Sequence, residues 1–412
     1  MSRRVVITGM GTVNPLGKNV EEFWENIKAN KNGLSFIDQF DASDFPVKIV
    51  GAVKDFDPTV CIDKKEARRM DRFTQFALYA SVEALKNAGS DFKDVDPFKA
   101  GVIIGVGVGG LNLTESEVTK FNEKKDKVSV FFIPMMIGNM AAGTVAMKTG
   151  FKGDNFCTTT ACSSATHAIG EAFRKIKDGY LDVCLCGGSE ACISRFALSG
   201  FCNMKALSQA EELDKASTPF DANRQGFVLG EGAGILCLEE YEHAKARGAN
   251  IIAEVAGYGA TGDAYHMTSP SPTGEAAAHA MKTAYTEAGL RPDEVNYINA
   301  HGTSTGLNDK YETNAIKIAL GEDAAGKCVI NSTKSMVGHL LGAAGGVEAI
   351  VTALSVKNDF VHKTINYTTP DPECDLDYAT DKNREMTVNA ALSNSLGFGG
   401  HNATICIKKY TG

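Results

Sequence analysis

Strand-like and helix-like segments alternate along the whole chain, and this alternation limits the possible folds more than any other feature. Short apolar runs of the kind found in buried strands lie at 4–9, 101–107, 182–188, 234–240, 251–259, 296–302, 328–332 and 402–409. Helix-like segments lie between them, for example at 69–89, 274–289 and 309–321. The pattern predicts an α/β fold with largely parallel strands that are buried on both faces.

No low-complexity segment and no linker rich in proline or serine divides the 412 residues. The best seam lies near 240–255, where a charged helix-like segment ends at Gly248 and a new apolar strand begins. We therefore expect two units, residues 1–250 and 251–412. Each contains a glycine cluster before a strand with a central cysteine, at 230–240 and 397–409, which is weak evidence for an internal duplication.

Cysteine usage and charge exclude several classes of protein. The eleven cysteines include no CxxC pair and no Cys/His spacing typical of zinc, so we expect no metal site. The first apolar run is too short for a signal peptide, and no apolar stretch reaches membrane-spanning length. An odd number of cysteines without a signal peptide indicates reduced thiols and a cytoplasmic protein. The net charge of −8 does not favour nucleic acid as a partner.

One cysteine, Cys162, lies among small side chains in "TTTACSSATHAIGEAFRKI". The apolar residues behind it recur at helical spacing, so Cys162 is expected at the first turn of an amphipathic helix. There, free backbone N–H groups favour a thiolate and could hold an oxyanion. A buried structural cysteine is the competing interpretation, and only suitable partner residues can overturn it.

Candidate partners come from three glycine-rich segments. His301 follows a strand-like run in "NAHGTSTG", at a strand end where α/β enzymes collect catalytic groups. Lys334 and His339 lie in "NSTKSMVGHLLGAAGG". Phe398 stands between two glycines in "SNSLGFGGHN", which indicates a loop that moves or lets backbone approach a ligand.

Four motifs, "TACSSA", "HGTST", "KSMVGH" and "NSLGFGG", occur in this order. With these separations the chain resembles the elongating β-ketoacyl-acyl carrier protein synthases of bacterial type II fatty acid synthesis. The resemblance runs over essentially the whole chain. It implies a thiolase-like fold, in which two similar halves form five αβαβα layers, and it implies a homodimer.

The resemblance also implies a Cys-His-His site for decarboxylative condensation. Cys162 would carry the acyl group, and the backbone N–H groups of Cys162 and Phe398 would form an oxyanion hole. His301 and His339 would stabilise the enolate of malonyl thioester. Lys334 would be paired with Glu348, either as an electrostatic aid or as a structural ion pair. Phe398 would also gate the site. The substrate-binding set implied by the resemblance is Thr303 and Thr305 for pantetheine, Val108 and Phe201 for a medium-to-long acyl chain, and Glu348.

The implied partner is an acidic acyl carrier protein, and the implied chemistry needs neither a redox cofactor nor a metal. Basic residues of the "DKKEARRMDRF" segment match the docking face of the family, and further lysines extend it. The docking set is Lys65, Arg68, Arg69, Lys124, Lys125 and Lys205. A charge run is more often a solvated helix face, so docking rests on the resemblance.

Two residues depart from the family pattern, and two alternative functions remain open. Gly306 stands where many members have proline, and His401 stands where threonine is usual, which leaves the chain-length preference open. A polyketide ketosynthase shares the motifs, although a free-standing length without fused domains favours fatty acid synthesis. A carrier-binding or acyl-binding homologue without turnover is the other alternative, and the intact set of Cys162, His301, His339 and Lys334 argues against it.

Overall fold

The computed structural model of the protein describes residues 3–124 and 127–412. Ten strands form one large sheet in the order β10-β9-β13-β14-β8-β1-β7-β6-β4-β5. They are β1 (Val5–Val13), β4 (Ala100–Gly105), β5 (Asn155–Thr158), β6 (Val183–Glu190), β7 (Gly232–Glu240), β8 (Ala253–Gly262), β9 (Tyr297–Asn299), β10 (Val329–Asn331), β13 (Ala390–Gly397) and β14 (His401–Lys408).

The sheet consists of two halves with the same internal order. Counting strands along each half, both read third, second, fourth, fifth, first, as β5-β4-β6-β7-β1 and as β10-β9-β13-β14-β8. Antiparallel pairing of β1 with β8 joins the halves. The segments 230–240 and 397–409 contain β7 and β14, the fifth strand of each half, so the repeated glycine-then-strand pattern marks a true duplication.

The expectation of largely parallel strands is wrong for about half of the pairings. The pairs β4–β5, β4–β6, β9–β10 and β9–β13 are parallel. The pairs β6–β7, β1–β7, β13–β14 and β8–β14, together with the β1–β8 junction, are antiparallel. A strand whose two faces are both covered by helices has the same apolar sequence pattern in a mixed sheet and in a parallel sheet. Apolar runs therefore do not reveal whether neighbouring strands run parallel or antiparallel.

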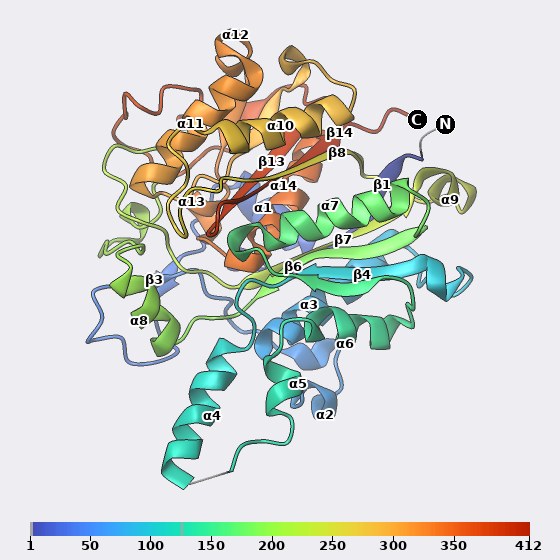
Figure 1. The fold of residues 1–412 in the computed structure, drawn as a ribbon, viewed down its shortest axis with the longest axis vertical. Helices are drawn as coiled ribbons and strands as arrows, with labels where there is room; N and C mark the ends of the chain where they lie inside the picture. The colour runs from blue at the N-terminus through green and yellow to red at the C-terminus, as the bar shows by residue number, and fades with distance from the viewer. Residues whose placement is uncertain (1–2, 125–126) are drawn as a thin grey trace.

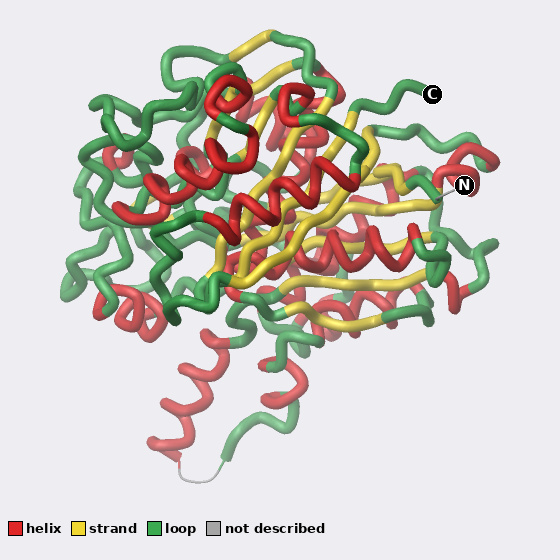
Figure 2. The backbone as a smooth tube through the Cα atoms, turned by 45° about the horizontal axis from the view of Figure 1, so that its top comes forward, coloured by secondary structure: helices red, strands yellow, loops and turns green. Residues whose placement is uncertain are grey.

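Helices cover both outer faces and fill the space between the halves, which gives the five αβαβα layers (Figure 1). In the tube view of Figure 2, the strands run through the middle of the molecule with helices outside them. One outer layer contains α3 (Arg72–Ala88) and α6 (Met140–Thr149), and the other contains α10 (Glu275–Glu287) and α11 (Gly306–Leu320). The central layer contains α7 (Ser164–Lys177) and α14 (Ala344–Asn358).

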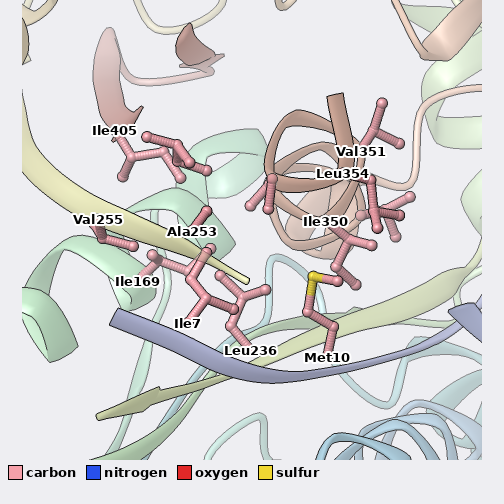
Figure 3. Close-up of a cluster of buried hydrophobic side chains, with 14 of the residues drawn as sticks. Ile7, Met10, Ile169, Leu236, Ala253, Val255, Ile350, Val351, Leu354 and Ile405 are labelled. Carbon is pink, nitrogen blue, oxygen red and sulfur yellow. The ribbon is translucent and has the colours of Figure 1, made fainter. Parts of the chain in front are cut away.

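The central layer explains why α14 is apolar on all sides. Every residue from Ala344 to Val356 is buried, because α14 lies between two sheet halves instead of facing solvent. In Figure 3, Ile350 and Leu354 of α14 lie in the same buried cluster as Met10 of β1 and Leu236 of β7. Each central helix begins after a short turn with a left-handed first residue, Ala161 (φ 51°) before α7 and Leu341 (φ 46°) before α14.

The remaining elements surround this framework. An arm made of α4 (Leu111–Lys124) and α5 (Phe132–Met136) projects from the body (Figure 1). The boundary expected at residue 250 lies between α9 and β8. None of the helices in the described part of the chain is long and apolar enough to cross a membrane. The other helices and strands are α1 (Val20–Lys28), α2 (Lys64–Ala67), α8 (Arg195–Asn203), α9 (Tyr241–Ala246), α12 (Glu322–Ala325), α13 (Lys334–Val337), β2 (Ser35–Phe36), β3 (Ile49–Val50), β11 (Phe360–Val361) and β12 (Arg384–Glu385).

Candidate active site

Cys162, His301 and His339 come together although they are far apart in the sequence. Cys162 lies in the turn before α7, His301 follows β9, and His339 follows α13. The thiol sulfur and one imidazole nitrogen of each histidine lie within 4.8 Å of one another. The same three atoms could ligate a metal ion, and no other group of three His, Cys, Asp or Glu residues in the described ranges does so. The absence of a metal stays a prediction.

Burial dominates the chemistry of the Cys162 thiol. It raises the pKa of Cys162 to about 12, although the charge of Lys334 and the backbone N–H groups of Phe398 and Cys162 act in the opposite direction. The expectation that the helix start favours a thiolate is therefore wrong for the unliganded site. The helix N-terminus is present, but desolvation of the charged form outweighs it.

This pKa predicts the pH dependence of alkylation. A thiol is unreactive when protonated, so the rate of Cys162 alkylation by iodoacetamide should still rise about tenfold per pH unit between pH 8 and pH 10. A short peptide with one exposed cysteine, whose pKa lies near the usual ~8.5, should level off over the same range. Mass spectrometry of the Cys162 peptide at each pH measures the rate. A plateau below pH 8 would show a stabilised thiolate and contradict the prediction.

Both histidines are neutral. Burial and the nearby charge of Lys334 lower the pKa of His301 and His339 well below the usual value, and the imidazole of His339 contributes to the shift at His301. Their rings stand edge to face with centroids 5.2 Å apart. Within the described residues, Nδ1 of His301 and both ring nitrogens of His339 have no hydrogen-bond partner. These nitrogens are available to hydrogen-bond a group that enters the site.

The sequence reasoning missed two residues that hold these histidines. Glu312 on α11 accepts hydrogen bonds from the backbone N–H groups of His301 and Gly302, both at 2.8 Å. The ring of Phe227 packs edge-on against His339 at 5.3 Å. Neither residue lies in a motif with its partner, so only the tertiary structure identifies them.

Lys334 and Glu348 form an ion pair beneath the site. Nζ of Lys334 donates a hydrogen bond to Oε1 of Glu348, and the two side chains are 1% and 2% exposed. Neither residue lines the cavity beside Cys162. The expectation that Glu348 binds substrate is corrected by this placement, because its carboxylate faces Lys334 behind the cavity wall. Lys334 acts on Cys162 and the two histidines through its charge.

Removal of one member of this pair should destabilise the fold strongly. Lys334→Met leaves a buried carboxylate without its cation, and we expect the free energy of unfolding to fall by about 3–5 kcal/mol. The double variant Lys334→Met/Glu348→Leu should recover most of this loss, because no charge is then left unpaired. Urea titrations of both variants measure the difference. A double variant as unstable as the single one would contradict the ion-pair explanation.

A cavity of about 380 Å³ opens onto the three residues and is lined from both halves of the chain. Val108, Phe201, Thr303, Thr305 and Phe398 all lie in its wall, where the sequence placed them. The hydroxyl oxygens of Thr303 and Thr305 lie 2.9 Å apart. Lining residues that the sequence reasoning missed are Gln225, Asp263, Thr268, Asn308, Leu341 and Asn402.

Phe398 lies in the tight turn between β13 and β14. Gly399 (φ 86°) and Gly400 (φ 73°) adopt left-handed conformations that a side chain would strain. The turn is tied to segment 263–270 by a hydrogen bond from the N–H of Gly399 to the carbonyl of Met267 and by one from Asn402 to Asp263. His401 is exposed and lies outside the cavity wall, with its ring 6.5 Å from that of His167 on α7.

The expected docking residues fall on two surfaces of this chain. Lys65, Arg68 and Arg69 are exposed on and after α2, and the Arg69 guanidinium lies 5.0 Å from the Phe131 ring at the start of α5. Lys205 follows α8 and is exposed at the cavity. In Figure 1, α2 and α8 lie on different parts of the molecule. Lys124 is the last residue of α4, and Lys125 lies outside the described residues.

Comparison with known proteins places this site in a family. The family model "Beta-ketoacyl synthase, N-terminal domain" matches residues 2–244, and "Beta-ketoacyl synthase, C-terminal domain" matches residues 252–368. A curated 3-oxoacyl-(acyl-carrier-protein) synthase 2 from Synechocystis is 49% identical over 99% of this chain and 98% of its own length. One from Staphylococcus aureus strain N315 is also 49% identical, over 99% of both chains.

Solved structures agree with the sequence relatives. The ketosynthase of a type II polyketide synthase, solved with its acyl carrier protein, superposes with a TM-score of 0.92 at 37% identity over the full length of both chains. A β-ketoacyl synthase from Burkholderia phymatum superposes with a TM-score of 0.91 at 34% identity, over 99% of this chain and 100% of the other. The two matched family models cover more than half of the chain, and the chain therefore belongs to the β-ketoacyl synthase family.

Proposed function

We propose that this protein is an elongating 3-oxoacyl-(acyl-carrier-protein) synthase that joins an acyl group on Cys162 to malonyl thioester with loss of carbon dioxide. The observation that carries the proposal is the meeting of a buried thiol with two neutral histidines, three of whose four ring nitrogens have no hydrogen-bond partner among the described residues. Curated relatives with the same name, at 49% identity over nearly the whole chain, support the substrate class.

The first half-reaction moves the acyl group. The sulfur of Cys162 attacks the carbonyl carbon of the acyl-carrier thioester, and a neutral imidazole accepts the thiol proton. The backbone N–H groups of Cys162 and Phe398 hold the oxyanion. The carrier sulfur then leaves and takes the proton. Transient proton removal by a histidine is needed because the free thiol has a pKa of about 12.

The second half-reaction makes the carbon–carbon bond. Malonyl thioester places its carbonyl oxygen near the N–H groups of His301 and His339. Cleavage of the bond to the carboxylate releases carbon dioxide and leaves the electron pair in an enolate. Its carbon attacks the acyl carbonyl on Cys162, and the sulfur leaves and is reprotonated. Neutral imidazoles donate to the enolate without burying a second net charge beside Lys334.

The wall of the cavity provides separate surfaces for the acyl chain and for the pantetheine arm of the substrate. Val108, Phe201 and Leu341 provide an apolar surface for an acyl chain, and Thr303 and Thr305 provide hydroxyls for the pantetheine arm. The balanced reaction requires no redox cofactor and no metal.

A two-step mass-resolved assay tests the proposed function. The protein is incubated with acyl-carrier thioesters of increasing length, and malonyl-carrier thioester is then added. We expect an acyl mass on the Cys162 peptide, followed by a β-ketoacyl product. Acylation without product would favour the carrier-binding or acyl-binding homologue and would contradict the proposal.

A polyketide ketosynthase is the second candidate, because such an enzyme superposes with a TM-score of 0.92. The two candidates differ in the number of condensations. A fatty acid synthase enzyme adds one two-carbon unit and releases a β-ketoacyl product for reduction, whereas a polyketide enzyme repeats the condensation. Product masses in excess malonyl-carrier thioester distinguish them.

The proposed partner is an acidic acyl carrier protein bound by the exposed cations. Charge reversal at Lys205 should raise the KM for acyl-carrier thioester by about three- to tenfold at low salt, and the difference should shrink as salt screens the surface. Arg68→Glu should act in the same way. Lys382→Glu, an exposed lysine away from the cavity wall, is the control. Steady-state kinetics at 50 mM and 300 mM salt measure the effect, and equal KM values for all three variants would contradict it.

We also infer a homodimer formed through the arm and through β5. The arm exposes apolar side chains at Val118, Phe121, Val130, Phe131 and Ile133. β5 is an edge strand whose only strand partner in the described part of the chain is β4, and such edges favour pairing with another chain. Light scattering of the protein tests this. A cytoplasmic location is proposed too, and it is supported by the free state of all eleven cysteines.

A further inference from the structure

A buried carboxylate that the proposed chemistry does not use lies beside the site. Glu190 is the last residue of β6, and its side chain is completely buried. Its two oxygens accept hydrogen bonds from the backbone N–H groups of Gly107 (2.8 Å), Val108 (3.1 Å), Gly109 (3.0 Å) and Gly342 (3.2 Å). One side chain therefore joins two separate loops of the protein.

Both loops carry apolar residues of the cavity wall. Val108 lies in the loop between β4 and α4, and Leu341 lies in the turn before α14. Leu341 has a left-handed conformation (φ 46°), and the N–H of the next residue, Gly342, donates to Glu190. The carboxylate thus fixes the relative position of the two apolar surfaces that the proposed function assigns to the acyl chain.

The space around this carboxylate leaves no room for adjustment. A methyl group on Gly107 would lie 2.7 Å from Oε2 of Glu190. A methyl group on Gly342 would lie 2.7 Å from the same oxygen and 2.2 Å from the nitrogen of Gly107. The two loops meet closely only because both positions lack a side chain and because the carboxylate lies between them.

Only a carboxylate suits these four donors. It offers about four acceptor sites on two oxygens, whereas the amide of glutamine offers acceptors on one oxygen and turns an NH₂ group toward N–H donors. Burial raises the pKa of Glu190 to about 7, while the four N–H groups act in the opposite direction. A buried carboxylate is costly for stability, which is expected where a residue serves the site.

We propose that Glu190 is a positioning residue that sets the acyl-length preference of the enzyme by holding Val108 and Leu341 in place at the acyl end of the cavity. The inference rests on the proposed function and names a determinant of its substrate range. A chain that reaches Val108 depends on Glu190, and a chain too short to reach it does not.

Glu190→Gln tests the inference against a matched control. Glu83→Gln removes a half-buried carboxylate that accepts hydrogen bonds from the backbone N–H groups of Thr12 and Val20 and lies outside the cavity wall. The rate of Cys162 acylation is measured by mass spectrometry for acyl-carrier thioesters from two carbons upward. One methylene in an apolar pocket changes a rate by about 10-fold or more.

The expected result is a change in the length profile. For each protein we compare the rate of Cys162 acylation at the best acyl length with the rate for a chain two carbons longer. The ratio of these two rates should be about tenfold smaller in Glu190→Gln than in the unmodified protein. The rate with the two-carbon chain should change least, because this chain offers the least apolar surface to Val108 and Leu341. Glu83→Gln should keep the original profile. Gly107→Ala, which displaces the carboxylate without removing it, should change the profile as Glu190→Gln does.

An unchanged profile in folded Glu190→Gln, or an equal loss at every length, would overturn the inference. If Glu190→Gln fails to fold, Gly107→Ala decides, and loss of the fold in both variants would make Glu190 a stability residue and overturn the inference. An unmodified protein that is acylated but forms no β-ketoacyl product refutes the proposed function, while the acylation profile still decides the role of Glu190. A protein that accepts no acyl group refutes both.

Discussion

Cys162→Ala is expected to abolish covalent acylation and to lower condensation by roughly 10⁴-fold or more. The proposed reaction passes through a thioester on this sulfur, and no neighbouring group can replace it. Decarboxylation of malonyl-carrier thioester should persist, because it depends on His301 and His339. Intact-protein mass spectrometry and carbon dioxide release measure the two reactions separately.

Cys192→Ala is the matched control. Cys192 is completely buried and belongs to the same apolar cluster as Cys162, but it does not line the cavity. Its replacement should leave acylation within about threefold of the unmodified protein, since a change of this kind affects packing more than chemistry. Acylation that survives in Cys162→Ala would contradict the proposed nucleophile.

His301→Ala is expected to separate the two half-reactions. Loss of one donor to a developing oxyanion lowers a rate by about 10²–10³-fold, so condensation and malonyl decarboxylation should fall by that amount. Acylation of Cys162 should fall by less than about tenfold, because His339 remains and the backbone N–H groups hold the oxyanion of that step. Single-turnover acylation and carbon dioxide release measure the two effects.

His362→Ala controls for the loss of a buried imidazole. His362 is buried in the same half of the chain and contacts Thr333 at 3.0 Å, but it lies outside the cavity wall. It should lower stability without separating the half-reactions. Equal losses of acylation and condensation in His301→Ala would refute its role in stabilising the enolate.

The principal candidate residues were predictable because each stands in a short motif with an unusual composition. Cys162 lies among small residues at a helix start, and His301 after β9 and His339 after α13 lie in glycine-rich loops. Resemblance to a family connected these motifs before any distance was known. In the structure, the sulfur of Cys162 and one ring nitrogen each of His301 and His339 lie within 4.8 Å of one another. The sequence could not show this proximity.

The supporting residues were not predictable in the same way. Glu190 and Phe227 each act on a loop that is distant in the sequence, and Glu312 on α11 acts on the loop just before that helix. None of the three has a neighbour that reveals its role. The protonation of Cys162 was predicted wrongly for a related reason. A helix start is visible in the sequence, but the depth of burial that raises the pKa of the thiol depends on packing against the other half of the chain.

The amino-acid sequence by itself determined the alternation of strands and helices and the identity of the reactive side chains, because these depend on local apolar patterns and on motif chemistry. It contained only weak evidence for the repeat of the two halves. Only the tertiary structure decided strand direction, the meeting of the two halves at one cavity and the protonation of the site. Strand pairing and burial are non-local: β1 joins β8 across the chain, and Glu190 joins loops separated by more than two hundred residues. Such contacts arise only when the halves pack together, and the reactivity of Cys162 depends on that packing.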